Sequence, residues 1–214
     1  MRLDPAAFNR FLGEIGQQVA WRRSYACACL NPASGAPDPK HALCAGKGRL
    51  WNAPVQTVCG ITRQDVSPEL IAAGLFDAGD MQMTIPSSSP MWRDAGRFDR
   101  VVMLNATEVF SQPFTRGAPT EKIIFAWKTI DRCFWLHPTT RQAVEGSVPV
   151  IDADGRPSWP GGVGEPPPAT TYSLTGIKLV EYYLLDQLPS NRGEHLGAEL
   201  PKRVTLRRFD LFGR

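Results

Sequence analysis

The stretch RFDRVVMLNATEVFS, residues 97 to 111, decides the expected fold class of this chain. Its apolar and polar residues alternate, and a period of two residues is typical of a half-buried β-strand. Short patterns of this kind dominate the sequence from about residue 51 onward. They are VQTVCGI (55–61), DMQMTI (80–85), KIIFAWKTIDRCFWL (122–136), SVPVIDADGRPSW (147–159), TYSLTGIKLVEYYLL (171–185) and RVTLRRFDLF (203–212). We therefore expect a mainly β fold, a sandwich or barrel-like antiparallel domain, because no helix-length crossovers alternate with the strands.

Three further segments refine this expectation. Asp154-Gly155 lies between two strand patterns and predicts a hairpin turn. The segment SPELIAAGLFDAGD (67–80) predicts one short helix, with Ser67 as its N-cap and Gly74 as its end. The segment DGRPSWPGGVGEPPPATT (154–171) is rich in Pro and Gly, which indicates an extended surface loop or an arm that reaches a neighbour.

The N-terminal segment predicts an amphipathic helix. Asp4 is a suitable N-cap, and Pro5 stands at the first helical position, where its missing N–H costs nothing. Apolar residues recur at helical spacing, namely Phe8, Phe11, Leu12, Ile15 and Val19. This stripe packs either on its own domain or on a neighbouring subunit. The predicted organisation is an N-terminal helix (1–24), a small lobe (25–52) and a mainly β domain (53–214).

Composition sets further bounds. The chain has 214 residues, of which 43% are hydrophobic and 21% charged, which is typical of a globular protein. A net charge of +3 is only mildly basic and leaves non-specific DNA contact open. The longest apolar stretches, VVML (101–104) and YYLL (182–185), are far shorter than the roughly 20 residues of a membrane span. Because charged residues interrupt the N-terminal segment, we expect no signal peptide and synthesis in a cytoplasm, where thiols stay reduced.

Three of the five cysteines and one of the three histidines lie close together in the sequence. Cys27, Cys29, His41 and Cys44 form the pattern C-x-C-x11-H-x2-C, and Gly46 and Gly48 follow it. Zinc takes four tetrahedral N or S ligands, and two close pairs separated by a loop supply them. The Cys27-x-Cys29 pair is tighter than the usual two-residue gap. We expect a small zinc-knuckle lobe with structural Zn²⁺ on these four residues.

Two other interpretations of the cluster stay open: inert cysteines without metal, and a redox or catalytic site. Four potential protein ligands would close the coordination sphere, which favours a structural role. Cys59 and Cys133 lie within strand patterns, and we expect them to be buried small hydrophobes. Cys59 is close enough in sequence to replace a weak ligand.

We expect no catalytic residues and no cofactor-binding residues besides the metal ligands. The sequence contains no H-E-x-x-H, G-x-S-x-G or G-x-x-x-x-G-K-[ST] motif. His137 ends a strand pattern and is predicted to be structural, whereas His195 is predicted in a loop, and Asp152 and Asp154 belong to a turn. The basic stretch LPKRVTLRRFDLFGR (200–214) could contact nucleic-acid phosphates or an acidic partner. We favour the other interpretation, an edge strand whose basic side chains are solvated.

Three stretches resemble structural proteins of tailed bacteriophages from the neck, or head–tail connection. They are MRLDPAAFNRFLGEIGQQVAWRRSYACACLNPASGAPDPKHALCAGKGRLW (1–51), GDMQMTIPSSSPMWRDAGRFDRVVMLNATEVFSQPFTRG (79–117) and LPKRVTLRRFDLFGR (200–214). In that family the second ligand pair is commonly C-x-x-C, and here it is His41-x-x-Cys44, which zinc also accepts.

The resemblance implies a non-enzymatic virion subunit of the connector, collar or head-closure type. Such subunits form a homo-oligomeric ring around the DNA channel, next to portal, neck and tail proteins. They bind no membrane and no small-molecule substrate. A tail or baseplate component, or a zinc-containing nucleic-acid-binding or processing protein, remains an alternative.

Overall fold

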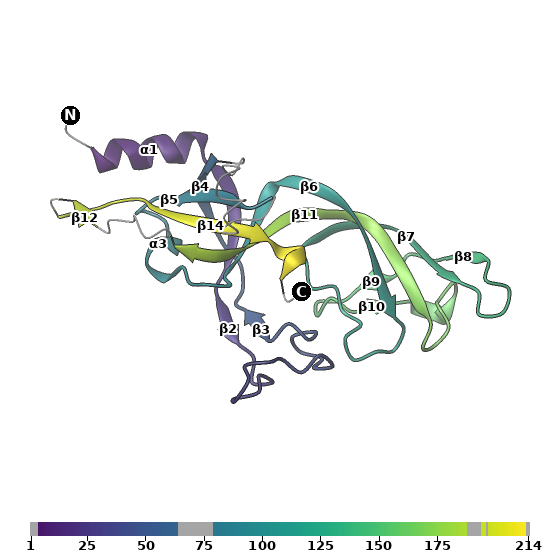
Figure 1. Cartoon of the computed structure of the whole chain (residues 1–214). Coiled ribbons are helices and arrows are strands. Elements are labelled where there is room, and N and C mark those ends of the chain that lie inside the picture. The colour runs from purple at the N-terminus through teal and green to yellow at the C-terminus, as the bar shows by residue number, and fades with distance from the viewer. Residues whose placement is uncertain (1–3, 64–78, 188–193, 196, 213–214) are drawn as a thin grey trace. The chain divides into compact units, whose positions relative to one another are not determined.

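The computed structural model describes residues 4–63, 79–187, 194–195 and 197–212 (Figure 1). The protein is mainly β, as the sequence predicts, with a helix near the N-terminus and a lobe that carries the Cys/His cluster. The chain divides into two compact units. Unit 1 comprises Met1–Tyr25, Trp51–Asn105 and Glu181–Arg214, and unit 2 comprises Ala26–Leu50 and Ala106–Val180. The helix expected at 67–80 falls almost entirely outside the described residues.

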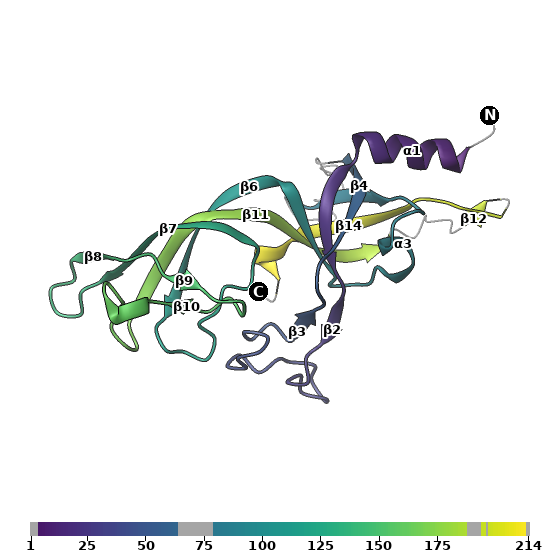
Figure 2. The same cartoon turned by 180° about the vertical axis from the view of Figure 1, so that it is seen from behind.

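The N-terminal helix of unit 1, α1 (Pro5–Ile15), begins as predicted. The Asp4 carboxylate accepts hydrogen bonds from the amides of Ala6 and Ala7 at 3.0 and 3.3 Å. The helix lies beside β4 (Val55–Arg63) (Figure 1 and Figure 2). There the side chain of Leu12 is buried against Gly60. This side of the helix therefore packs on its own unit, which is one of the two alternatives that the sequence left open.

The helix is shorter than the segment 1–24 for which it was predicted, and this part of the prediction is wrong. It ends at Ile15, and Gly16 adopts an extended backbone. A Cβ atom at Gly16 would lie 2.3 Å from the Leu12 carbonyl oxygen and 2.4 Å from Val58 Cγ1, so the close turn requires glycine. Val19, expected on the apolar side of the helix, is instead fully buried in strand β1 (Gln17–Arg22).

Six strands of unit 1 close into an antiparallel barrel. The order is β14-β5-β4-β1-β6-β11, and β11 pairs back with β14. The barrel strands not yet given are β5 (Met81–Ile85), β6 (Arg100–Thr115), β11 (Thr171–Gln187) and β14 (Lys202–Arg208). The strands β6 and β11 are long and also supply residues to unit 2. β14 pairs on both sides, so the edge position expected for the strand in the basic stretch 200–214 is wrong.

The barrel interior is filled by apolar side chains from every strand. Each fully buried aliphatic side chain contributes about 1.5–3 kcal/mol relative to its exposed state. The fully buried members include Val19, Met83, Ile85, Val101, Leu184, Val204 and Leu206. A register shift between Leu184 and Asp186 in the β11–β14 pair marks a bulge, which increases local bending and helps the sheet to close.

Shorter elements complete unit 1. Asp99 is buried and accepts hydrogen bonds from Trp21 Nε1 and from the amides of Ser24 and Gly96, at 2.8, 2.8 and 2.9 Å. These bonds hold the end of β1 against the loop before β6. The remaining elements are α3 (Met91–Asp94), the hairpin β12 (Glu194–His195) and β13 (Ala198–Glu199), and the 3-10 helix η2 (Phe209–Leu211).

Unit 2 contains the rest of the same eight-stranded sheet and has its own core. Here β11 pairs with β7 (Trp127–Leu136), and β7 pairs with β8 (Ala143–Gly146), so the strand order is β6-β11-β7-β8. The hairpin of β9 (Val150–Ile151) and β10 (Pro157–Ser158) turns at Asp154-Gly155, as predicted, and Gly155 has φ 81°. The buried core residues are Phe110, Phe114, Ile123, Cys133, Trp135, Trp159, Tyr172 and Leu174.

The segment 154–171 is not an extended arm over its whole length, and this prediction needs correction. Trp159 is buried in the unit 2 core, where its Nε1 donates to the Ser147 carbonyl oxygen at 2.8 Å. The following residues form the 3-10 helix η1 (Pro160–Gly162). Because one large aromatic side chain can anchor a segment that is otherwise Pro/Gly-rich, composition alone misled the prediction.

Candidate metal centre

The structure brings together the four residues predicted as metal ligands. Cys27 and Cys29 follow β2 (Ser24–Ala26), whereas His41 and Cys44 precede β3 (Arg49–Trp51). The Sγ atoms of Cys27 and Cys44 each lie 3.5 Å from His41 Nδ1, and Cys29 Sγ lies 3.5 Å from Cys44 Sγ. All four ligand atoms lie within 4.8 Å of one another.

These separations fit a common metal ion. A tetrahedral ion with bonds of about 2.0–2.3 Å holds its S and N ligands about 3.4–3.8 Å apart. The three observed separations of 3.5 Å fall in this range. They do not fit a disulfide, whose S–S length is about 2.05 Å, and all five cysteines are free thiols. The cluster could therefore hold a metal ion with four protein ligands.

Backbone hydrogen bonds position the two ligand pairs. The Cys27 amide donates to the Gly48 carbonyl oxygen at 3.0 Å, which joins the first pair to the segment after the second. The Lys47 amide donates to the Cys44 carbonyl oxygen at 3.0 Å, and the Gly46 amide donates to that of His41 at 3.3 Å. The chain thus folds tightly back on itself behind the second pair.

The two glycines of the motif are required by this tight path. Gly46 and Gly48 have φ of 75° and 68°, in the left-handed region that favours glycine. A Cβ at Gly46 would lie 2.8 Å from the Pro39 carbonyl oxygen, and one at Gly48 would lie 2.7 Å from Leu30 Cδ2. Both glycines therefore allow the tight turn that follows the candidate ligands His41 and Cys44.

The lobe that carries the cluster has almost no apolar interior. Residues 31–40 are all exposed, and within residues 26–50 the only buried positions are Cys27, Cys44 and Gly48. The two cysteine side chains are 2% and 3% exposed. Since the buried side chains of the lobe are themselves candidate ligands, a bound ion would replace the hydrophobic core that the lobe lacks.

The other two cysteines are buried within strands, as predicted. Cys59 is buried in the barrel strand β4, and burial raises the pKa of its thiol to about 12. Cys133 belongs to the core of unit 2, and burial raises its pKa to about 11. Thiols with raised pKa are poor nucleophiles and poor metal ligands at neutral pH, and the metal-ligating group identified among the described residues does not include Cys59.

Two further predictions on polar residues are confirmed. His137 Nδ1 accepts hydrogen bonds from the amides of Thr139 and Thr140 at 3.3 and 3.2 Å, which is a structural turn role. The Asp152 carboxylate accepts from the amides of Asp154 and Arg156 within the hairpin turn. His195 was expected in a loop, and its backbone instead belongs to the short strand β12.

The C-terminal basic residues are engaged in contacts within unit 1. Arg207 forms a bidentate ion pair with the buried carboxylate of Asp80, at 2.8 Å between Nη2 and Oδ2. The Lys202 ammonium donates to the Trp92 carbonyl oxygen at 2.9 Å and lies 4.0 Å from the centroid of its ring. These cations stabilise the barrel, so a simple solvated strand does not describe them.

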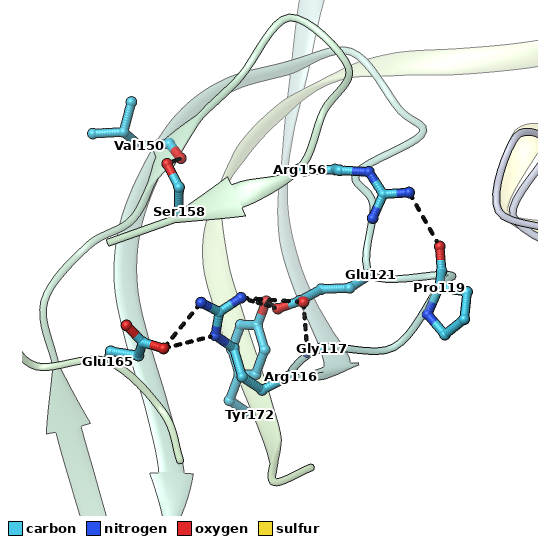
Figure 3. Close-up of polar contacts among 9 residues, drawn as sticks. All are labelled: Arg116, Gly117, Pro119, Glu121, Val150, Arg156, Ser158, Glu165 and Tyr172. Carbon is cyan, nitrogen blue, oxygen red and sulfur yellow. Dashed lines mark hydrogen bonds and ion pairs between the residues drawn. The ribbon is translucent and has the colours of Figure 1, made fainter. Parts of the chain in front are cut away.

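Sequence reasoning missed two polar networks. In unit 1, the side chains of Arg100 and Glu181 are both only 3% exposed and form an ion pair. In unit 2, Arg116 lies between the carboxylates of Glu121 and Glu165 (Figure 3). Neither network has a local sequence signal, because the partners are 81 residues apart in the first network and up to 49 in the second.

Comparison of the chain with models of known protein families finds no match, and comparison with curated proteins finds none either. Within the described residues, no helix has the length and hydropathy that a membrane span requires.

Proposed function

We propose that the chain is a non-enzymatic structural subunit of a tailed-phage virion. In this proposal it forms a homo-oligomeric ring at the neck, where head and tail join and DNA passes through. The resemblance of residues 1–51, 79–117 and 200–214 to neck proteins supports the assignment. The subunit then resides in the virion after synthesis in the host cytoplasm.

The observation that carries the proposal is the convergence of four ligand atoms in a lobe without an apolar core. Zn²⁺ is the ion that best matches three thiolates and one imidazole at tetrahedral spacing. Four protein ligands leave no open coordination position for a substrate or an activated water. The residues therefore suit a structural brace in a non-enzymatic subunit.

The exposed side of α1 supports the ring. Phe8, Phe11 and Ile15 are 41%, 52% and 64% exposed, although they belong to the same apolar stripe as the buried Leu12. A ring repeats one heterologous contact until the rotation closes. An apolar helix side of this size suits such a contact, because it stays partly solvated in a lone subunit.

Imaging of purified protein tests the ring directly. We expect electron microscopy to show closed rings with a single rotational symmetry and a central channel. Phe11→Glu should shift the population to smaller species in analytical ultracentrifugation. Val163→Glu is the matched control, since Val163 is an exposed apolar residue of unit 2. Monomers at every concentration, or equal behaviour of the two variants, would count against the proposal.

Two alternatives are separated by other measurements. Localisation in imaged virions distinguishes a neck position from a tail or baseplate position. A gel shift at moderate salt tests a zinc-containing nucleic-acid-binding protein. Tight, strongly salt-dependent binding to free DNA would favour that alternative, because many phosphate contacts are needed to produce it.

A further inference from the structure

Unit 2 contains a cavity of about 380 Å³ that the metal centre does not account for. Ala45 and Lys47, which follow the ligand Cys44, line one part of it. The end of β6, the loop after it and the first residue of β11 line the rest. Cavities of about 300–1,000 Å³ are typical of small-ligand sites.

The lining of this cavity combines positive charge with hydrogen-bonding groups. Lys47 and Lys122 supply two ammonium groups, and no lining residue is acidic. The polar side chains between them are Gln112, Thr115, Thr120 and Thr171. Ammonium groups bind phosphate as point charges, and hydroxyl and amide groups can donate to its remaining oxygens.

The carboxylate of Glu121, a sequence neighbour of two lining residues, is engaged in the network of Figure 3. Glu121 lies between the lining residues Thr120 and Lys122 but is itself buried. Its carboxylate accepts from Arg116 Nη1 at 3.3 Å, from the Gly117 amide at 2.7 Å and from the Tyr172 hydroxyl at 2.7 Å. These donors compensate its charge and fix the loop that presents Thr120 and Lys122.

We propose that this cavity binds a phosphate group, carried either by a DNA backbone or by a free nucleotide. The inference deepens the proposed function and rests on it for DNA as a source of phosphate. Only two cations line the cavity and they hold one phosphate, so binding to DNA is weak and its salt dependence shallow: a slope of about −0.9 in log K against log salt for one phosphate contact. This differs from the steep dependence that a dedicated DNA-binding protein shows.

Titrations of the intact protein with three separate probes test the site. The probes are inorganic phosphate, a nucleoside monophosphate and a short DNA duplex. Amide shifts in ¹H–¹⁵N NMR spectra locate the binding, and fluorescence anisotropy of labelled duplex between 50 and 200 mM salt gives its strength. We expect the largest amide shifts at Lys47, Thr120 and Lys122.

The variant Lys47→Gln/Lys122→Gln should abolish these shifts and flatten the salt dependence. Over a fourfold change in salt, the dissociation constant for the duplex should rise about 3.5-fold more for the wild type than for this variant. Lys128→Gln is the charge-matched control, since Lys128 is exposed on β7 of the same unit. Unchanged metal content and melting temperature show that the double variant is folded.

Each outcome is decisive. Localised binding of the nucleotide but not of the duplex supports the site and identifies the free nucleotide as its ligand. Shifts outside the cavity, equal behaviour of the double variant and Lys128→Gln, or no binding of any probe overturns the inference. Ring formation and metal content, measured on the same samples, show separately whether the proposed function stands.

Discussion

The buried ion pair of unit 1 gives a sharp prediction for stability. Glu181→Gln keeps the size of the side chain but removes its charge, while Arg100 stays buried. In the wild type, Arg100 Nε donates to Glu181 Oε2 at 2.9 Å. Arg22 is a second cation that interacts with this pair. Burial lowers the pKa of Arg22, and the charge of Arg100 lowers it further, whereas the charge of Glu181 raises it. The substitution therefore leaves two arginines without their common counter-charge.

The expected loss is large. Removing one partner of a buried ion pair costs about 3–5 kcal/mol, since the remaining charge is desolvated and uncompensated. Proteins of this size change their melting temperature by about 2–4 °C for each kcal/mol. Glu181→Gln should therefore lower the midpoint by about 6–20 °C in calorimetry. Urea unfolding followed by tryptophan fluorescence should give the same loss of free energy.

An exposed pair supplies the matched control. Arg132 and Glu145 form a bidentate pair with distances of 2.8 and 3.1 Å, but their side chains are 62% and 57% exposed. Solvent screens such pairs, so Glu145→Gln should leave the midpoint within experimental error of the wild type. Equal effects of the two substitutions would refute the reasoning that burial, not pairing, sets the cost.

Three further predictions concern other parts of the chain. Burial raises the pKa of Cys59 from 9.0 to about 12, so the contribution of this buried thiol to the free energy of unfolding should be fully present below pH 9 and be lost as pH rises to 12. In urea unfolding at several pH values, Cys59→Ala should reduce the dependence of that free energy on pH, and an unchanged dependence would disprove the role of Cys59. Tyr172→Phe removes one hydrogen-bond donor from the buried Glu121 carboxylate and should lower the free energy of unfolding by about 1–3 kcal/mol in chemical unfolding. An unchanged free energy would show that water replaces the hydroxyl and would contradict the prediction. Gly48→Ala forces an alanine into the left-handed region, at about 1–2 kcal/mol, and its Cβ against Leu30, so it should weaken metal retention in a competition with chelator. Gly35→Ala carries the same left-handed strain in open space and is the control for the contact with Leu30, so it should retain the metal.

The strands were predictable because their signal is local. The alternation in residues 97–111 and 171–185 corresponds to β6 and β11, and the expected barrel or sandwich is a closed barrel. The division into two units was not predictable, because these two strands each pass through both units without a break in their pattern. The prediction that β14 is an edge strand was wrong for a similar reason, because strands far away in the sequence, β5 and β11, decide its position in the sheet.

The candidate metal centre was predictable from spacing alone. Cys27, Cys29, His41 and Cys44 lie within one short segment, so no long-range topology was needed to bring them together. The N-terminal helix shows the limit of such local reasoning. Val19 continues the helical spacing of the preceding apolar residues, yet the crowding around Gly16 ends the helix, and that contact involves Val58 of a distant strand.

Metal analysis of natively purified protein, combined with NMR of the lobe, tests the central claim most directly. The account predicts about one zinc ion per chain, retained by the wild type and lost from Cys44→Ser. Chelation should broaden or collapse the amide signals of residues 27–48 while the barrel signals persist, because Cys27 and Cys44 are the only buried side chains there. A metal-free protein with those signals fully dispersed would contradict it.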